Sequence, residues 1–232
     1  MNASRWFGDA RIRLYAGAAL ISLSPVWVKL VSVSPTTSGF YRVLIGGGAL
    51  AIYLVLGGKR LSLSRRVWSI LGLAAVFFAL DLWFWHRSIQ YVGPGLSTLL
   101  ANFQVFFMML AGAFLLGQAP SRSQLVAVPI ALLGLTLIVG IDPDKLTTDY
   151  RWGVTFGLLT AVSYSGYLLT LRASRSGSTY RLPTREVAVI SLATAAILGV
   201  TAFLEGESLV LSNSSDVAWL FGYGILSHCL GS

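Results

Sequence analysis

The chain has 232 residues, of which 55% are hydrophobic and 11% are charged, and its mean hydropathy is +0.73. Soluble domains carry roughly 25% charged residues, so this composition excludes a soluble globular fold. The formal charge of +8 does not indicate nucleic-acid binding, because the cations are spread between apolar segments and do not gather on one helix or tail.

Eight apolar segments, each about long enough to cross a bilayer, follow one another along the chain. Backbone groups in hydrocarbon must bond to one another, so runs of this length predict membrane-spanning helices and an all-α, polytopic helical membrane protein. Gly46-Gly47-Gly48 in the second segment predicts a patch of close helix packing, and Gly93-Pro94-Gly95 predicts a turn between the third and fourth. The predicted spans are residues 14–33, 38–56, 67–91, 93–116, 124–140, 153–171, 186–204 and 217–232.

The Lys and Arg residues between the spans alternate in number, and this sets the predicted orientation. Twelve of them fall before the first span and in every second gap after it, whereas two fall in the remaining gaps. Basic segments stay in the cytoplasm, so we predict a multi-pass protein of the inner (cytoplasmic) membrane with its N-terminus in the cytoplasm. The basic N-terminus superficially resembles a secretory signal, but no convincing cleavage motif closes the apolar run, and we interpret it as the first transmembrane helix.

The order of the spans also predicts an internal repeat. A block of five helices followed by a second copy would place that copy upside down, and residues 17–27 match residues 157–167 weakly. Inverted repeats are typical of many secondary transporters. We therefore divide the chain into a first repeat, residues 1–140 with spans one to five, and a second, inverted and incomplete repeat, residues 141–232 with spans six to eight.

Ionisable side chains occur within the spans, where each costs about 2.5–3.5 kcal/mol on insertion scales. Asp81 lies near the middle of the third span and His86 roughly 7 Å beyond it, while Lys29 and Arg42 lie in the outer halves of the first two spans. One interpretation is a polar cavity with a protonatable carboxylate at its floor; the other is a structural ion pair of Asp81 with Lys29 or Arg42. Because five residues correspond to about 140° of helix rotation, we reject a catalytic pair of Asp81 with His86.

Five further residues complete the candidate pathway for substrate or protons. His228 lies near mid-membrane in the eighth span, where it either exchanges protons or bonds to a neighbouring carbonyl. Trp27 and Tyr164 are aromatic candidates for lining a cavity, and the amides Asn102 and Gln104 either join helices or line the cavity. We predict no catalytic residue and no cofactor. We also predict no metal site, since one cysteine and two histidines are too few for a typical closed zinc site.

Several stretches of these spans resemble a known family. They are residues 79–86, 88–92, 99–104, 115–118 and 130–138, together with Trp27-Val28-Lys29 and Tyr41-Arg42. In them the chain resembles the EamA family of the drug/metabolite transporter superfamily. The resemblance implies a ten-helix, inverted five-plus-five transporter that moves small metabolites, often amino acids or toxic compounds, usually by export and without ATP. It also implies a central cavity to which Trp27, Asp81, His86 and Tyr164 contribute.

Three features depart from the family pattern. Val105 stands where the family usually has a proline, which puts a kink in the fourth span in doubt, and Gln118 stands where it often has Glu. The chain stops within the eighth predicted span, so we expect about eight helices to be present and the chain to be truncated at its C-terminus, a fragment without spans nine and ten.

The sequence thus predicts a secondary transporter of small metabolites such as amino acids, and no enzyme. Two alternatives stay open: a non-transporting membrane fragment or scaffold, and a membrane-embedded lipid-processing enzyme. The expected partners are a small-molecule substrate and the lipid bilayer, with no nucleic acid; a homodimer is left open.

Overall fold

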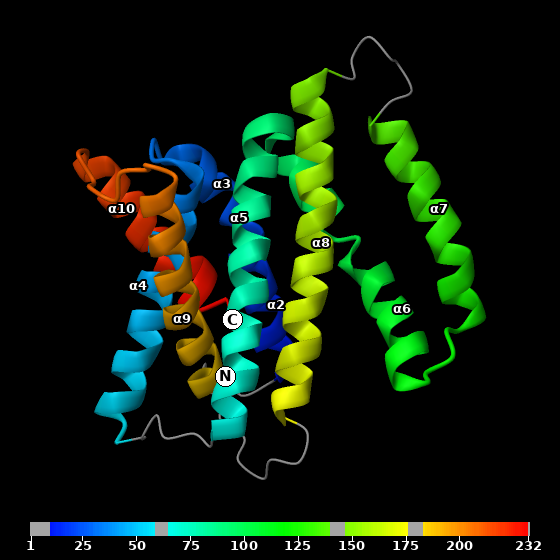
Figure 1. Ribbon diagram of the computed structural model, residues 1–232, viewed down its shortest axis with the longest axis horizontal. Helices are drawn as coiled ribbons and strands as arrows, with labels where there is room; N and C mark the ends of the chain where they lie inside the picture. The colour runs from blue at the N-terminus through cyan, green and yellow to red at the C-terminus, as the bar shows by residue number, and fades with distance from the viewer. Residues whose placement is uncertain (1–9, 59–64, 140–146, 176–182, 232) are drawn as a thin grey trace, which may run out of the picture.

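The computed structural model describes residues 10–58, 65–139, 147–175 and 183–231, and this part of the chain is largely helical and contains no strand (Figure 1). Four stretches of it are helical, long and apolar enough to cross a membrane: Pro35–Leu56, Arg65–Leu115, Thr148–Ser174 and Thr184–Leu204. The prediction of an all-α helical membrane protein is confirmed. Most of the charged gaps used to predict the orientation, residues 1–9, 59–64, 140–146 and 176–182, lie outside the described residues.

Each of the eight predicted spans coincides with at least one helix. The helices are α2 (Ala10–Ser22), α3 (Ser24–Leu30), α4 (Pro35–Leu56), α5 (Arg65–Ala101), α6 (Gln104–Leu116), α7 (Arg122–Val139), α8 (Thr148–Arg175), α9 (Pro183–Leu204), α10 (Ser214–Gly222) and η2 (Tyr223–Cys229), a π-helix.

Two interruptions divide the long stretch from α5 to α6. At Gly93 the backbone takes φ 80° and ψ 167°, a conformation that residues with a Cβ rarely adopt, so the predicted turn is confirmed. The second interruption separates α5 from α6 at Asn102 and Phe103. The fourth predicted span is therefore broken even though Val105 replaces the proline of the family pattern. Here the Asn102 side chain donates to the backbone oxygen of Thr98, one turn earlier.

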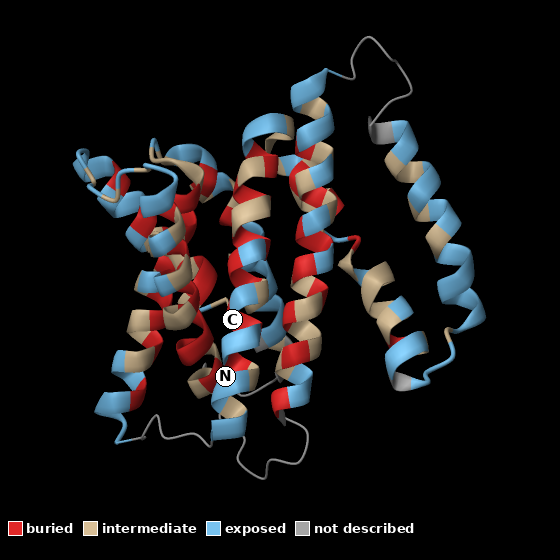
Figure 2. Ribbon diagram, in the orientation of Figure 1, coloured by how far each residue is buried: buried red, intermediate tan, exposed pale blue. Residues whose placement is uncertain are grey.

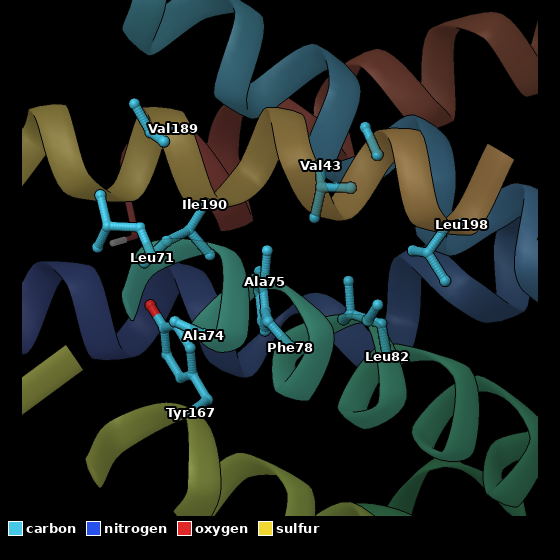
Figure 3. Close-up of a cluster of buried hydrophobic side chains, with 12 residues drawn as sticks. Val43, Leu71, Ala74, Ala75, Phe78, Leu82, Tyr167, Val189, Ile190 and Leu198 are labelled. Atoms are coloured by element: carbon cyan, nitrogen blue, oxygen red, sulfur yellow. The ribbon is translucent and has the colours of Figure 1, made fainter. Parts of the chain in front are cut away.

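The core of the bundle lies between α4, α5, α8 and α9. α5 packs along α8, and α4 packs along α9. Val43 of α4, Phe78 of α5, Tyr167 of α8 and Leu198 of α9 belong to one cluster of buried apolar side chains (Figure 3). The rings of Phe78 and Tyr167 stack with their centres 4.9 Å apart. Lipid offers little hydrophobic driving force between helices, so association depends on such close packing.

Glycines bring α4 close to its neighbours. A Cβ added at Gly46 would lie 2.6 Å from the backbone oxygen of Gly224 in η2, and one at Gly47 would lie 2.6 Å from Cβ of Ser191 in α9. A Cβ at Gly48 would meet no atom within 4 Å. The predicted close-packing patch is thus confirmed at Gly46 and Gly47, and it positions η2 and α9 against α4.

α6 and α7 stand to one side of the other helices (Figure 1). Their described side chains are mostly exposed or half-buried, whereas α5, α8 and α9 turn buried faces toward one another (Figure 2). The exposed side chains of α7 include Leu125, Ile130, Leu133 and Leu137. In a bilayer, such apolar faces contact lipid.

Candidate functional site

Arg42 of α4 contacts side chains of both η2 and α5. Its Nη1 donates a 3.0 Å hydrogen bond to the hydroxyl of Tyr223. The centre of its guanidinium lies 5.0 Å from the centre of the Tyr223 ring and 5.7 Å from that of Trp85. Both aromatic side chains are buried. The cation is therefore held beside two aromatic rings, whose quadrupoles stabilise it.

His86 of α5 extends these polar contacts. Its Nδ1 lies 2.7 Å from the backbone oxygen of Leu82, one turn earlier on the same helix. A carbonyl oxygen only accepts, so Nδ1 carries the proton, and in the neutral ring Nε2 is then an acceptor. Nε2 lies 3.4 Å from the Tyr223 hydroxyl. Hydrogen-bond donation thus runs in one direction, from Arg42 through Tyr223 to His86.

Asp81 lies on α5 five residues before His86 and is only 7% exposed. Within the described residues it forms no hydrogen bond and no ion pair shorter than 4 Å. Lys29 is exposed in the last turn of α3. The alternative of a structural ion pair between Asp81 and either basic residue is therefore wrong for this structure, because neither cation comes within ion-pair distance.

His228 of η2 is buried against α9 and α5. Its Nε2 lies 2.7 Å from the hydroxyl of Ser191, and its ring stacks on that of Phe78 with the centres 5.8 Å apart. The hydrogen-bond partner of His228 is thus the hydroxyl of Ser191 on another helix. The structural alternative considered from the sequence was a bond to a neighbouring carbonyl. This bond ties η2 to α9 near the glycines of α4.

Three buried donors beside these contacts have no hydrogen-bond partner among the described residues. They are Nε of Arg42, the hydroxyl of Ser38 and Nε1 of Trp27. Ser38 precedes Arg42 by one turn of α4, so the two lie on one face of the helix. Trp27 packs in the same small apolar cluster as Trp85 and Tyr223. The excess of donors favours a ligand that accepts hydrogen bonds.

The remaining predicted site residues do not join this group. Asn102 is exposed and bonds to its own helix. The backbone oxygen of Gln104 accepts a 3.2 Å hydrogen bond from Ser165, which joins α6 to α8. Tyr164 is half-buried at the edge of the apolar core. The structure therefore brings Arg42 and His86 together at Tyr223, with Trp27 in the adjoining apolar cluster, while Asp81 lies farther along α5 and His228 lies on η2.

Sequence reasoning does not find Tyr223, Ser38 or Ser191. Tyr223 and His228 are five residues apart, which in an α-helix separates them by about 140°. The π-helix η2 forms i to i+5 hydrogen bonds, so Tyr223 and His228 lie closer to the same face of the helix than they would in an α-helix. No signal in the sequence predicts a π-helix, so the relative position of Tyr223 and His228 could not be predicted from the sequence.

A second polar group lies at the end of the bundle where α4 begins and α9 ends. Nη2 of Arg87 lies 2.7 Å from Oε1 of Glu205 and 3.8 Å from Oε1 of Glu207. Glu205 also accepts hydrogen bonds from the Thr36 hydroxyl, at 2.7 Å, and from the Trp83 indole, at 2.9 Å. The Arg87 guanidinium lies 3.8 Å from the centre of a Trp83 ring. We call these five residues the ion-pair cluster.

The ion-pair cluster is also absent from the sequence prediction, because Arg87 and Glu205 are 118 residues apart. Burial raises the pKa of Glu205, but hydrogen bonds from Thr36 and Trp83 and the charge of Arg87 lower it by more, so the pKa lies below its usual value. The carboxylate is therefore ionised at neutral pH. Within the described part of the chain, no group of three or more His, Cys, Asp or Glu side chains is placed to hold a metal ion.

Residues 12–140, more than half of the chain, match the family described as "EamA-like transporter family". The chain belongs to the EamA-like transporter family. The resemblance seen in the sequence is thus confirmed, and this EamA-like chain is a multi-pass membrane protein of a transporter family.

Two relatives of this EamA-like chain are named as uncharacterized transporters. The "uncharacterized inner membrane transporter YhbE" of Escherichia coli K12 is 27% identical over 226 residues, which cover 92% of this chain and 69% of YhbE. The "uncharacterized transporter YwfM" of Bacillus subtilis 168 is 26% identical over 163 residues, covering 69% of this chain and 53% of YwfM. A solved crystal structure at 20% identity gives a TM-score of 0.69, covers 100% of this chain and 77% of its own, and supports the fold alone.

Proposed function

We propose that this protein is a secondary transporter that exports small metabolites, such as amino acids or related compounds, across the cytoplasmic membrane without ATP hydrolysis. Its family and relatives named as inner membrane transporters support a transport role. In this proposal the protein carries its substrate unchanged and is not an enzyme. The N-terminus is placed in the cytoplasm because twelve of the Lys and Arg residues fall on that side.

The observation that carries the proposal is the polar chain from Arg42 through Tyr223 to His86, with Asp81 on the same helix as His86. These side chains come from α4, η2 and α5 and lie between helices of membrane-spanning length. Charged groups at membrane depth are costly, and in transporters they typically mark the path of a substrate or an ion.

The chemistry of this group suits an amino acid. Arg42 and the buried donors beside it suit a carboxylate, because guanidinium and carboxylate form charge-assisted hydrogen bonds. Asp81, which has no ion-pair partner among the described residues, suits an ammonium group. Trp27 and Trp85 supply apolar surface for the rest of the molecule.

We further propose that a proton gradient drives export, with one or both of Asp81 and His228 exchanging protons. Both are buried within the helical bundle. A carboxylate without an ion-pair partner can bind and release a proton without breaking such a pair, and histidine titrates in the physiological range when its environment permits.

The experiment that tests this function is flux through proteoliposomes that contain the purified chain. A panel of radiolabelled amino acids is supplied with and without a pH gradient, and empty liposomes and the Arg42→Gln variant serve as controls. Gradient-dependent flux that Arg42→Gln lacks supports the proposal. Conversion of an added isoprenoid lipid would indicate the lipid-processing enzyme, and neither flux nor conversion would indicate a scaffold.

A further inference from the structure

We propose that the ion-pair cluster is a gate, closed in this structure. It would lie between the polar chain of Arg42, Tyr223 and His86, here called the Arg42 site, and the side of the membrane on which α4 begins. The proposed orientation makes this the side opposite the cytoplasm. The inference rests on the proposed function, since a gate serves a protein that moves a substrate.

The ion-pair cluster and the Arg42 site share two helices. On α4, Thr36 precedes Arg42 by six residues, about 9 Å of helix rise, and the buried Ser38 lies between them. On α5, Arg87 follows His86 directly. The cluster thus joins α4 to α5 between the Arg42 site and the end of the bundle where α4 begins.

Gly206 lies between the two carboxylates of the cluster, each of which contacts both α4 and α5. Its φ of 71° is one that residues with a Cβ rarely adopt. On one side of it Glu205 binds Arg87; on the other, Glu207 accepts hydrogen bonds from the backbone N–H and hydroxyl of Thr37, at 2.9 and 3.2 Å. Glu207 therefore caps the N-terminus of α4. Withdrawal of this one segment would release both α4 and α5.

The bonds of the cluster are suited to breaking and re-forming. The Arg87 side chain is 17% exposed and that of Glu205 is 27% exposed, so water hydrates both charges when they separate. Exposed ion pairs contribute little net stability for this reason. Elements held by a few polar bonds at an interface are those that rearrange when proteins switch between states.

The test measures access of a solute to position 38. Cys229 is the one cysteine of the chain, so Cys229→Ser removes the native thiol. Ser38→Cys then adds a single thiol in place of a buried hydroxyl that has no partner among the described residues. The full chain is placed in right-side-out and in inside-out membrane vesicles, and the rate of its reaction with a membrane-impermeant maleimide is measured from each side.

Charge removal is expected to open the gate. Arg87→Gln and Glu205→Gln should each raise the rate at which the maleimide labels the thiol at position 38 by roughly fivefold or more. The increase is expected from the side of the membrane on which α4 begins. The double variant that carries both Arg87→Glu and Glu205→Arg keeps an ion pair between the two positions. Its labelling rate should therefore return toward that of the parent. Arg151→Gln is the matched control, because it removes an exposed cation outside the cluster. Arg151 lies at the same end of the bundle as Arg87, since Gly153, two residues later, packs against Tyr91 of α5.

Equal labelling in the parent and in both single variants would overturn the gate, as would acceleration by Arg151→Gln. If Arg87→Gln does not elute as a single folded species, Glu205→Gln decides between these outcomes. Labelling needs no substrate, so it separates the two proposals. Cluster-dependent labelling without amino-acid flux would refute the proposed substrate and leave the gate; flux with labelling that ignores the cluster would refute the gate alone.

Discussion

The hydroxyl of Tyr223 accepts a 3.0 Å hydrogen bond from Arg42, and this bond joins η2 to α4. The same hydroxyl lies 3.4 Å from Nε2 of His86 on α5. One oxygen atom therefore connects three helices, and its removal would separate the cation from the histidine without changing any charge.

We expect Tyr223→Phe to reduce gradient-dependent flux by about tenfold or more, because a lost hydrogen bond to a charged group is worth about 1.5–3 kcal/mol and each 1.4 kcal/mol is about a factor of ten. The ring that packs against Arg42 is kept, so the purified variant should elute as the parent does. Tyr15→Phe, at an exposed position of α2, is the matched control. Unchanged flux in Tyr223→Phe would show that the hydroxyl has no part in transport.

We expect Asp81→Asn to reduce the pH dependence of flux, since an amide does not exchange protons in this range. Flux is measured between pH 5 and 8 with the membrane potential held at zero. Asp149→Asn, in the exposed first turn of α8, removes a carboxylate outside the site and should leave the profile unchanged. A parental profile in Asp81→Asn would remove this residue from the mechanism.

Gly46→Ala is expected to destabilise the bundle by about 1–3 kcal/mol, the usual cost of overpacking. The new methyl group would lie 2.6 Å from a backbone oxygen of η2, which cannot rotate away. Gly48→Ala, whose added Cβ meets no atom within 4 Å, should be neutral or slightly stabilising, because alanine favours helices. Thermal unfolding in detergent compares the two. A lower midpoint for Gly48→Ala than for Gly46→Ala would contradict the packing argument.

The ion-pair cluster should weaken in acid. Its environment lowers the pKa of Glu205 from the ordinary value of 4.5, so the stabilisation by the carboxylate is complete above pH 4.5 and is lost as the pH falls through the lower value in the folded protein. Glu205→Gln should therefore show a smaller loss of thermal stability below pH 4.5 than the parent. An equal or larger loss would contradict the ionised state of Glu205.

The sequence was sufficient to predict the helices, because long apolar runs have one solution in hydrocarbon. It also located the break at Gly93 and the close contact at Gly46, where glycine has a direct steric meaning. The candidate site was predicted in part: polar side chains within a span, such as Asp81 and His86, are expected to face the interior of the bundle, but their partners could not be predicted. Partner choice depends on how helices far apart in the sequence pack against one another.

Two errors show this limit. Lys29 and Arg42 lie at similar predicted depths, yet Lys29 is exposed while Arg42 contacts η2, because depth does not fix which face of a helix turns inward. The fourth predicted span is broken at Asn102 and Phe103 although no proline is present there. The π-helix η2 and the pairing of Arg87 with Glu205 have no counterpart in any local sequence signal.

The cap that Glu207 provides for α4 has a consequence for biosynthesis. The amide of Thr37 is made 170 residues before the carboxylate that binds it. At ribosomal rates of about 5–20 residues per second, that interval lasts roughly 10–30 s. During this time the first turn of α4 must be hydrated at the lipid headgroups, so α4 enters the membrane before its start is fixed and acquires its final anchoring only when the segment after α9 leaves the ribosome.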